Sequence, residues 1–261
     1  MNPPIAIAVA AHPDDIEFVM AGTLLRLKAV GWQIHYLNLS SGNCGSQTMG
    51  PAELAVLRLK EAKAAAELLG ARFHPPFSHD LEIMYDQAHL RRLAAILHQV
   101  APDIVLTHAP EDYMEDHMIT SRLAVTAAFT SSMPNFRTEP PVDAPLKEVA
   151  VYHAMPYELT DGLRRSVTPG LYVDVSDLQE IKRQALAAHA SQKQWLDASQ
   201  GMDSYLSTMS DMDRLIGTHS GCFASAEGWC RHDYRGFGSE DRDPLGEALG
   251  EQVFTRETND G

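Results

Sequence analysis

The sequence is poor in cysteine and has no long apolar run, and each shortage excludes a class of protein. Its 261 residues include three cysteines, an odd number without C-x-x-C spacing. This usage fits a reducing cytosol and argues against a thiolate zinc finger. No apolar run reaches the roughly 18 residues that a transmembrane helix needs. The N-terminus also lacks a basic segment followed by an apolar one, so we expect a cytoplasmic protein without a secretion signal or membrane association.

Basic residues are also scarce, with 21 Lys and Arg against 35 Asp and Glu and a formal net charge of -14. This balance disfavours nucleic acid and anionic membranes as general partners. A G-x-G-x-x-G loop is missing after the first apolar run, and two carboxylates stand in its place. Because they would repel a pyrophosphate, a dinucleotide-binding protein is disfavoured too. Histidine, in contrast, is frequent, and its 12 copies favour a metal site.

Short apolar runs alternate along the chain with segments of helical periodicity. The predicted strands lie at 5–11, 34–40, 103–108, 148–153 and 171–175. The predicted helices lie at 16–30, 51–69, 86–100, 117–130 and 177–197. This alternation predicts an α/β fold with βαβ units, in which a Rossmann-like, mostly parallel sheet carries helices on both faces.

The remaining segments lack a clear period. Segments 131–147 and 154–170 have the composition of surface loops. Segment 198–247 is rich in Gly, Ser and Asp, and we expect it to be irregular and to lie over the sheet edge. We therefore predict a core at 1–197 and an irregular C-terminal extension at 198–261 that packs on the same domain and ends in a frayed tail.

The sequence AHPDD at residues 11–15 directly follows the apolar run Ile5–Ala10, which is typical of a buried strand. Its proline cannot continue a central strand, so the strand should end near His12. Asp14 and Asp15 then lie where a strand passes into a helix, at the edge where open α/β sheets bind ligands. Such a cluster is costly without a compensating cation or proton, so it indicates a site that handles one of them.

A second polar cluster, THAPEDYMEDH at residues 107–117, follows another predicted strand and should lie at the same sheet edge. A hydrolytic zinc site needs three protein ligands and one open position for water. His12 and Asp15 supply two ligands, and His117 is the natural third. The two clusters together therefore predict a zinc site.

Nearby polar residues are left for supporting roles. Asp14 is adjacent to Asp15 but should point elsewhere, so it is free to act as a base on the attacking water. Asp116 can orient a ligand imidazole by a hydrogen bond to the ring nitrogen that does not bind the metal. For His108 we favour an ordinary strand-end position over a supporting role, and Cys44 has the features of a bystander thiol.

These motifs resemble the LmbE-like, or PIG-L, family of zinc-dependent N-deacetylases, which remove acetyl groups from N-acetylglucosaminyl conjugates. The two clusters carry most of the resemblance. It extends in order over residues 5–195 through four weaker elements: Gly22-Thr23, the turn Ser41–Ser46, Arg58 with Glu61, and His189-x-Ser191-Gln192.

The resemblance implies a hydrolase that removes an acetyl group from an N-acetylglucosamine-type sugar or conjugate. Zinc would be held by His12, Asp15 and His117, with Asp14 as general base. It also implies a homo-oligomer, a trimer or a hexamer. The residues expected to bind substrate are Arg58, Asn43, Asp112 and Met114. For Arg58 an equally weighted alternative is an exposed helix residue that pairs with Glu61 or Glu53.

One position departs from the family's pattern. Members often carry a histidine three residues before the ligand histidine, where this chain has Met114. Methionine cannot donate a hydrogen bond or stabilise an oxyanion. His153, at the end of a predicted strand, is our candidate to replace it as a catalytic residue. His189 is expected to support the site through a structural hydrogen bond.

Two alternatives to the sugar deacetylase remain open. One is hydrolysis of a different amide, such as a thiol-conjugate amide, because acyl and sugar pockets are built by variable loops. The other is a non-catalytic homologue that binds metal, with Met114 as the mark of lost activity.

Overall fold

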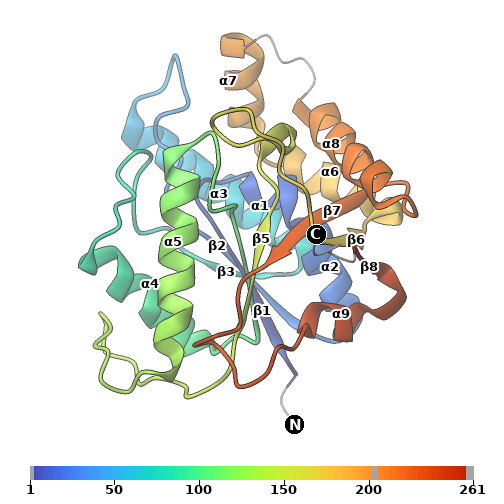
Figure 1. The fold of residues 1–261 in the computed structure, drawn as a ribbon. Helices are drawn as coiled ribbons and strands as arrows, with labels where there is room; N and C mark the ends of the chain where they lie inside the picture. The colour runs from blue at the N-terminus through green and yellow to red at the C-terminus, as the bar shows by residue number, and fades with distance from the viewer. Residues whose placement is uncertain (1–2, 201–204, 257–261) are drawn as a thin grey trace.

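The computed structural model describes residues 3–200 and 205–256, and within them eight strands form one sheet (Figure 1). Their order across the sheet is β3-β2-β1-β4-β5-β7-β6-β8. Neighbours from β3 to β5 are parallel, whereas β7 is antiparallel to both of its neighbours and β8 is antiparallel to β6. The strands are β1 (Ile5–Ala10), β2 (Gln33–Asn38), β3 (Arg72–His74), β4 (Ile104–Thr107), β5 (Ala150–Ala154), β6 (Leu171–Asp174), β7 (Ala226–Arg231) and β8 (Val253–Thr255).

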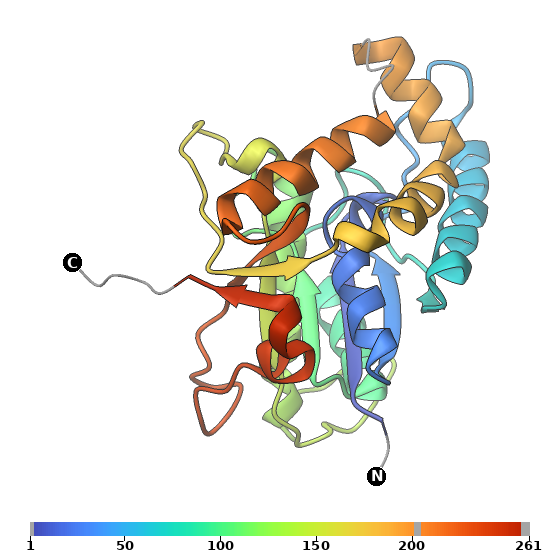
Figure 2. The same ribbon diagram turned by 90° about the vertical axis from the view of Figure 1, so that its right-hand side faces the viewer.

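Helices cover both faces of this sheet, with α4 and α5 on one side and α2, α3, α6 and α9 on the other (Figures 1 and 2). None of the helices in the described ranges is both long and apolar enough to cross a membrane. The helices are α1 (Asp15–Val19), α2 (Ala21–Ala29), α3 (Pro51–Leu69), α4 (Gln87–Val100), α5 (Glu115–Phe129), α6 (Gln179–Ala187), α7 (Ala190–Gln200), α8 (Tyr205–Ser220) and α9 (Pro244–Leu249).

Strand β1 shows why the sheet is covered on both faces. Its residues alternate between two apolar cores, because successive side chains of a strand point to opposite faces. Ala6 and Ala8 lie in the core that includes α2 and α3, while Ile7 and Val9 lie in the core that includes α4 and α5. All four are fully buried. The predicted α/β class with helices on both faces is confirmed.

Two predicted helices are each divided in the structure. The segment predicted as one helix at 16–30 forms α1 and α2, with Met20 between them in a non-helical conformation. The new N-terminus of α2 is stabilised from far along the chain, since the Glu227 carboxylate accepts the N–H groups of Gly22 and Thr23 at 2.8 and 2.7 Å. The segment predicted at 177–197 likewise forms α6 and α7, which are separated at 188–189.

The expectation of an irregular segment at 198–247 is wrong for the part that is described. This segment contains α8 and β7, and β7 lies inside the sheet, between β5 and β6. The sequence of β7, AEGWCR, has no β-branched residue and carries a glycine, so it lacks the composition of a strand. Strand β8 similarly replaces the beginning of the predicted frayed tail, whose last residues, 257–261, lie outside the described ranges.

Glu227 also explains why glycine precedes threonine at the start of α2. A Cβ on Gly22 would lie 2.4 Å from Val175 and 3.0 Å from Glu227. The Thr23 hydroxyl accepts a hydrogen bond from the Trp229 indole of β7 at 2.9 Å. The Gly-Thr element is therefore a docking surface for β7, and Lys182, 2.7 Å from Glu227, balances the buried charge.

Two histidines face each other on the neighbouring strands β2 and β3. His35 Nδ1 lies 2.8 Å from His74 Nε2, and the rings are stacked with centroids 5.1 Å apart. Burial, with repulsion from the partner and from Arg72, lowers the pKa of His35 to about 4, and burial with Arg72 lowers that of His74 to about 4. The folded protein therefore keeps both rings neutral in mildly acidic solution.

This pair predicts a loss of stability in acid. Histidines of the unfolded chain take up protons near pH 6.5, but the folded pair resists protonation down to about pH 4. The free energy of unfolding should therefore decrease, and the protein become less stable, as the pH falls from about 6.5 to about 4. In the variant His74→Gln this decrease should be shallower, as measured by urea unfolding at several pH values. Curves of equal slope for both proteins would contradict the prediction.

Candidate metal centre and substrate cleft

The two predicted clusters meet in one cleft at the carboxyl ends of β1 and β4. These strands are neighbours in the sheet, so the residues that follow them are brought together. The cleft has a volume of about 450 Å³. Its lining includes His12, Asp14, Asp15, Arg58, Asp112, Met114 and His117, as well as an apolar group formed by Phe18, Leu81, Tyr113, Met155, Tyr157, Trp195, Leu196 and Tyr205.

The Asp15 carboxylate lies at the centre of the polar part of the cleft. His12 Nδ1 is 3.5 Å from its Oδ2, and His117 Nε2 is 3.4 Å from its Oδ1. The backbone N–H of His12 donates to Oδ2 at 2.7 Å. The possible ligand atoms of the three residues all lie within 4.8 Å of one another, so the predicted ligand set converges on one point.

Each ligand histidine is held by a second carboxylate on its outer nitrogen. His12 Nε2 is 3.0 Å from Asp116 Oδ2, and His117 Nδ1 is 3.1 Å from Asp112 Oδ1. Such pairs fix the tautomer and turn the other nitrogen toward a metal. Asp116 was expected in this position. Asp112 was expected to bind substrate, but its Oδ1 instead orients His117 and accepts the N–H of Met114 at 3.0 Å.

His108 belongs to this cluster, contrary to the strand-end position that the sequence favoured. Its ring stacks on His117 with centroids 4.1 Å apart and planes 8° apart. Its Nε2 accepts the N–H of Ala11 at 2.9 Å and lies 3.2 Å from Asp15 Oδ2. His108 thus connects the two strand ends and supports the face of the His117 ring.

The charges of the cluster depend strongly on one another. Burial disfavours protonation of the two ligand histidines, but the neighbouring carboxylates raise the pKa of His12 to about 9 and that of His117 to about 10. Burial also opposes ionisation of Asp15, yet the nearby His117 and His108 hold its pKa well below the usual range. A buried, ionised carboxylate is stabilised by a positive charge beside it, and a divalent cation would supply one. Two imidazoles and one carboxylate are also a donor set that divalent metals prefer.

Asp14 points away from Asp15, as expected, because its backbone adopts a rare conformation. Its φ of 106° lies in a region that non-glycine residues seldom occupy, and such strain is typical of functional sites. Its Oδ2 accepts a hydrogen bond from the Tyr205 hydroxyl at 2.5 Å, and its Oδ1 lies 3.6 Å from the Arg58 guanidinium. Burial raises the pKa of Asp14, and Arg58 opposes this shift.

Arg58 is buried rather than exposed, so the alternative of a solvated helix residue is wrong. Its guanidinium also donates to the carbonyl oxygens of Pro13 and Gly42. Gly42 makes room for it, since a Cβ there would lie 2.7 Å from Arg58, and its φ of +72° favours glycine. The glycine of this turn and the arginine of α3 therefore act together to hold Asp14.

Other predicted residues lie near the cleft in supporting positions. Asn43, expected to bind substrate, accepts the N–H of Asp80 at 2.9 Å and so fixes its own loop. Glu61 accepts two hydrogen bonds from Ser191 at the beginning of α7, at 2.9 and 2.6 Å. Met114 does line the cleft.

Neither His153, the candidate to replace the missing histidine at Met114, nor His189 lines the cleft. His153 Nδ1 lies 2.8 Å from the His108 carbonyl oxygen, and its Nε2 lies 2.9 Å from His232 Nδ1. Burial lowers the pKa of His153 to about 4. With both nitrogens engaged and little tendency to bind a proton, His153 is badly placed for the catalytic role predicted for it. His189 is fully buried and its Nε2 lies 3.3 Å from Glu17, but neither ring nitrogen has the geometry of the hydrogen bond that was expected of it.

Tyr205 was not predicted as a site residue, because it begins α8 in a segment without a recognisable motif. Its hydroxyl is nevertheless the group that lies nearest to Asp14 among the contacts described above. Only the folding of α8 over the sheet edge could reveal it.

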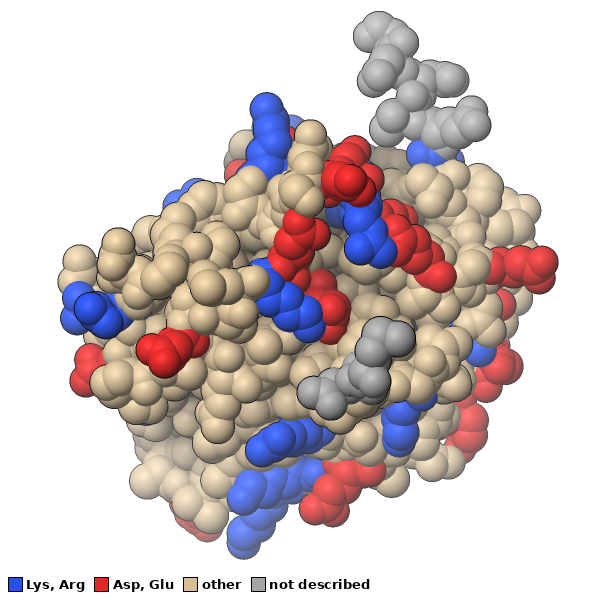
Figure 3. Space-filling view, turned by 90° about the horizontal axis from the view of Figure 1, so that it is seen from below, with Lys and Arg blue, Asp and Glu red and all other residues tan. Residues whose placement is uncertain are grey.

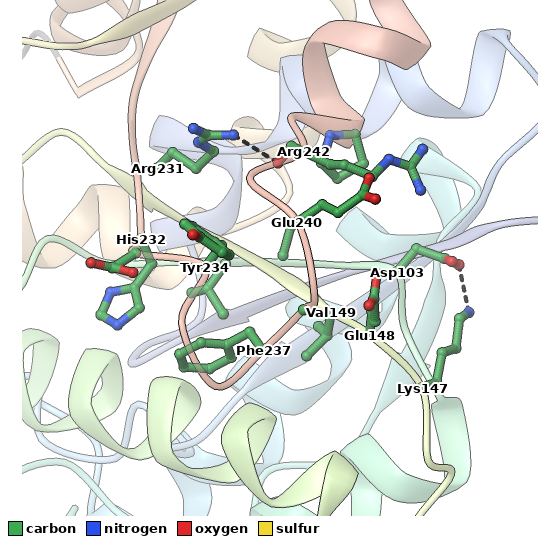
Figure 4. Close-up of a pocket in the computed structure, with 15 residues that line it drawn as sticks. Asp103, Lys147, Glu148, Val149, Arg231, His232, Tyr234, Phe237, Glu240 and Arg242 are labelled. Carbon is green, nitrogen blue, oxygen red and sulfur yellow. Dashed lines mark hydrogen bonds and ion pairs between the residues drawn. The ribbon is translucent and has the colours of Figure 1, made fainter.

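A smaller cavity of about 180 Å³ lies at the opposite edge of the sheet, at the amino ends of β4 and β5 (Figure 4). Its charged side chains are largely paired with partners close by: Lys147 with Asp103 at 2.8 Å, and Arg231 with Asp241 at 2.6 Å. Acidic and basic side chains are interspersed on the face seen from below (Figure 3). This cavity offers no cluster comparable to that around Asp15.

Known proteins resemble this chain in the part that forms the larger cleft. Residues 7–128 match the model of the PIG-L family, described as GlcNAc-PI de-N-acetylase. Over this segment, which is just under half of the chain, the protein is similar to the PIG-L family. Both polar clusters, at 11–15 and 107–117, fall within the matched residues.

The curated relatives include proteins named for two different activities, a deacetylase and a hydratase. The chain is 28% identical to a diacetylchitobiose deacetylase of Thermococcus kodakarensis over 193 residues, which are 71% of this chain and 69% of the relative. It is 29% identical to a 4-oxalmesaconate hydratase of Pseudomonas putida over 204 residues, which are 74% of this chain and 76% of the relative.

Among solved structures, the N,N'-diacetylchitobiose deacetylase of Pyrococcus horikoshii has the same fold. The TM-score is 0.76 at 23% identity, and the match covers 94% of this chain and 89% of that one. Sugar deacetylases are thus represented both among the sequence relatives of this protein and among proteins of the same fold.

The carboxylates behind the two ligand histidines predict a measurable effect on metal binding. Asp112→Asn and Asp116→Asn should each weaken zinc affinity by about 10- to 100-fold, because an amide no longer fixes the imidazole as strongly. Competition with a chromophoric chelator would measure this affinity. Asp233→Asn, on an exposed loop far along the chain, serves as the control. Equal affinity in all three variants would show that the two carboxylates do not orient ligands.

Proposed function

We propose that this protein is a zinc-dependent hydrolase that removes the acetyl group from an N-acetylated amino sugar or sugar conjugate. The observation that carries the proposal is the separation of tasks between adjacent aspartates: Asp15 faces the two ligand histidines, while Asp14 faces the open cleft. The relatedness to sugar deacetylases supports the same conclusion.

His12, Asp15 and His117 would hold the metal, and the donor set suits zinc. When bound, zinc acts as a Lewis acid that lowers the pKa of water and polarises an amide carbonyl. The chain's own residues supply the remaining tasks. Asp112 and Asp116 hold the two imidazoles in place, and His108 supports the ring of His117.

Asp14 is assigned as the general base that takes a proton from the attacking water. Burial raises the pKa of its carboxyl group and so increases its affinity for that proton. Arg58 and Tyr205 fix the position of both carboxylate oxygens. With Met114 unable to donate a proton and His153 turned away from the cleft, Asp14 itself returns the proton to the leaving amine.

A second candidate is suggested by the relative named 4-oxalmesaconate hydratase. A metal beside a carboxylate base can activate water for addition to a double bond as well as for attack on an amide. Release of acetate from an N-acetylated sugar distinguishes the deacetylase from the hydratase and from the non-catalytic homologue. The proposed trimer or hexamer remains a prediction that sedimentation can test.

Two substitutions test the assignment of roles. His117→Ala should lose zinc and acetate release together, because it removes a ligand. Asp14→Asn should retain zinc but lower kcat by about 100-fold or more, since an amide cannot accept the proton. The metal content is measured by elemental analysis, and turnover by acetate release from N-acetylglucosamine conjugates. Zinc retained in His117→Ala, or normal turnover in Asp14→Asn, would refute the corresponding role.

A further inference from the structure

One wall of the cleft is a continuous series of aromatic rings. It begins at the ligand His117, whose ring meets the edge of Tyr113 with centroids 5.6 Å apart. Tyr113 contacts Tyr157 at 6.3 Å, Tyr157 contacts Phe18 at 6.4 Å, and Phe18 contacts Tyr205 at 6.0 Å. The series, which we call the aromatic arc, thus extends from a metal ligand to the residue that holds Asp14.

The outer part of the arc is open to solvent. Tyr113 is 58% exposed and Tyr157 is 37% exposed, and Leu81, at 71% exposed, lines the same cleft. The rings come from segments far apart in the sequence: Phe18 from α1, Tyr113 from the loop before α5 and Tyr157 from the loop after β5. Exposed apolar side chains that gather around a cleft are typical of a ligand-binding surface.

The charges of the cleft exclude one class of ligand. Among the described residues that line it, Arg58 is the only lysine or arginine, and it is already engaged by Asp14 and two carbonyl oxygens. Four carboxylates line the same space: Asp14, Asp15, Asp80 and Asp112. Even with a divalent cation present, one negative charge remains in excess. A substrate bearing phosphate or carboxylate groups would be repelled, and no free guanidinium or ammonium would receive them.

We infer that this cleft selects uncharged N-acetylated sugars whose amine-bearing half carries an apolar, preferably aromatic, group that packs on Tyr113 and Tyr157. The inference rests on the proposed deacetylase function and specifies its substrate class. The acetyl group is small and belongs beside the metal ligands. The arc extends outward from that point, so the remainder of the substrate is the part that meets it.

Three N-acetylglucosamine derivatives with the same acetamide test the selection. They are 4-nitrophenyl N-acetylglucosaminide, which carries an aromatic group, methyl N-acetylglucosaminide, which does not, and N-acetylglucosamine 6-phosphate, which is anionic. For the zinc-loaded protein, kcat/KM should be about three- to tenfold higher for the nitrophenyl than for the methyl glycoside, as expected for one aromatic contact. The phosphate should be the poorest of the three.

Tyr157→Ala should remove the preference, so that the ratio of kcat/KM for the nitrophenyl glycoside to kcat/KM for the methyl glycoside decreases to about one. Tyr234→Ala is the matched control, because Tyr234 has a similar exposure of 38% but lines the smaller cavity at the other edge of the sheet. A preference that survives in Tyr157→Ala, or that disappears equally in Tyr234→Ala, would overturn the inference.

The inference about the aromatic arc and the proposed deacetylase activity can be tested independently of each other. Binding of the two neutral glycosides to zinc-loaded Asp14→Asn protein, measured by calorimetry, reports on the arc without turnover. Tighter binding of the nitrophenyl glycoside supports the inference, whereas equal binding, or binding of neither, overturns it. Absence of acetate release from all three sugars with the unaltered protein would instead overturn the deacetylase.

Discussion

The buried carboxylate of Asp15 is the constraint around which the rest of the site is arranged. A negative charge in this position requires positive partners close by, and three imidazoles surround it. Two of them require carboxylates of their own on the outer nitrogen, and these carboxylates in turn accept backbone N–H groups of Leu81 and Met114. One buried charge therefore fixes the ends of β1 and β4 and the two loops beside them.

The close approach of the three proposed ligands was predictable because it depends on local signals. Each cluster follows an apolar strand, and the carboxyl ends of neighbouring parallel strands lie at the same edge. His12, Asp15 and His117 could therefore be assigned without coordinates. Tyr205 could not, because its approach to Asp14 depends on α8 packing across 191 residues of sequence separation. Strand β7 was missed for a similar reason: its partners, and not its own composition, make it a strand.

Several short motifs that carry the weaker part of the resemblance have structural roles. Gly42 leaves space for Arg58, Gly22 leaves space for Glu227, and Glu61 binds the beginning of α7. Each of the three contacts joins segments that are separated in sequence. Spacing alone does not distinguish a glycine that approaches substrate from one that admits a neighbouring side chain. Arg58 shows how the two kinds of role converge, since a fully packed side chain also positions the proposed base.

The position of β7 also bears on how the chain is synthesised. A ribosome that has completed the first 197 residues has produced β5 and β6 but not the strand that joins them. Until residue 231 has emerged, the edge of β5 stays unpaired and β6 has no place in the sheet. Unpaired edges of this kind are prone to association with other chains. The nascent protein therefore carries an unpaired strand edge at a stage when His12, Asp15 and His117 have already been synthesised.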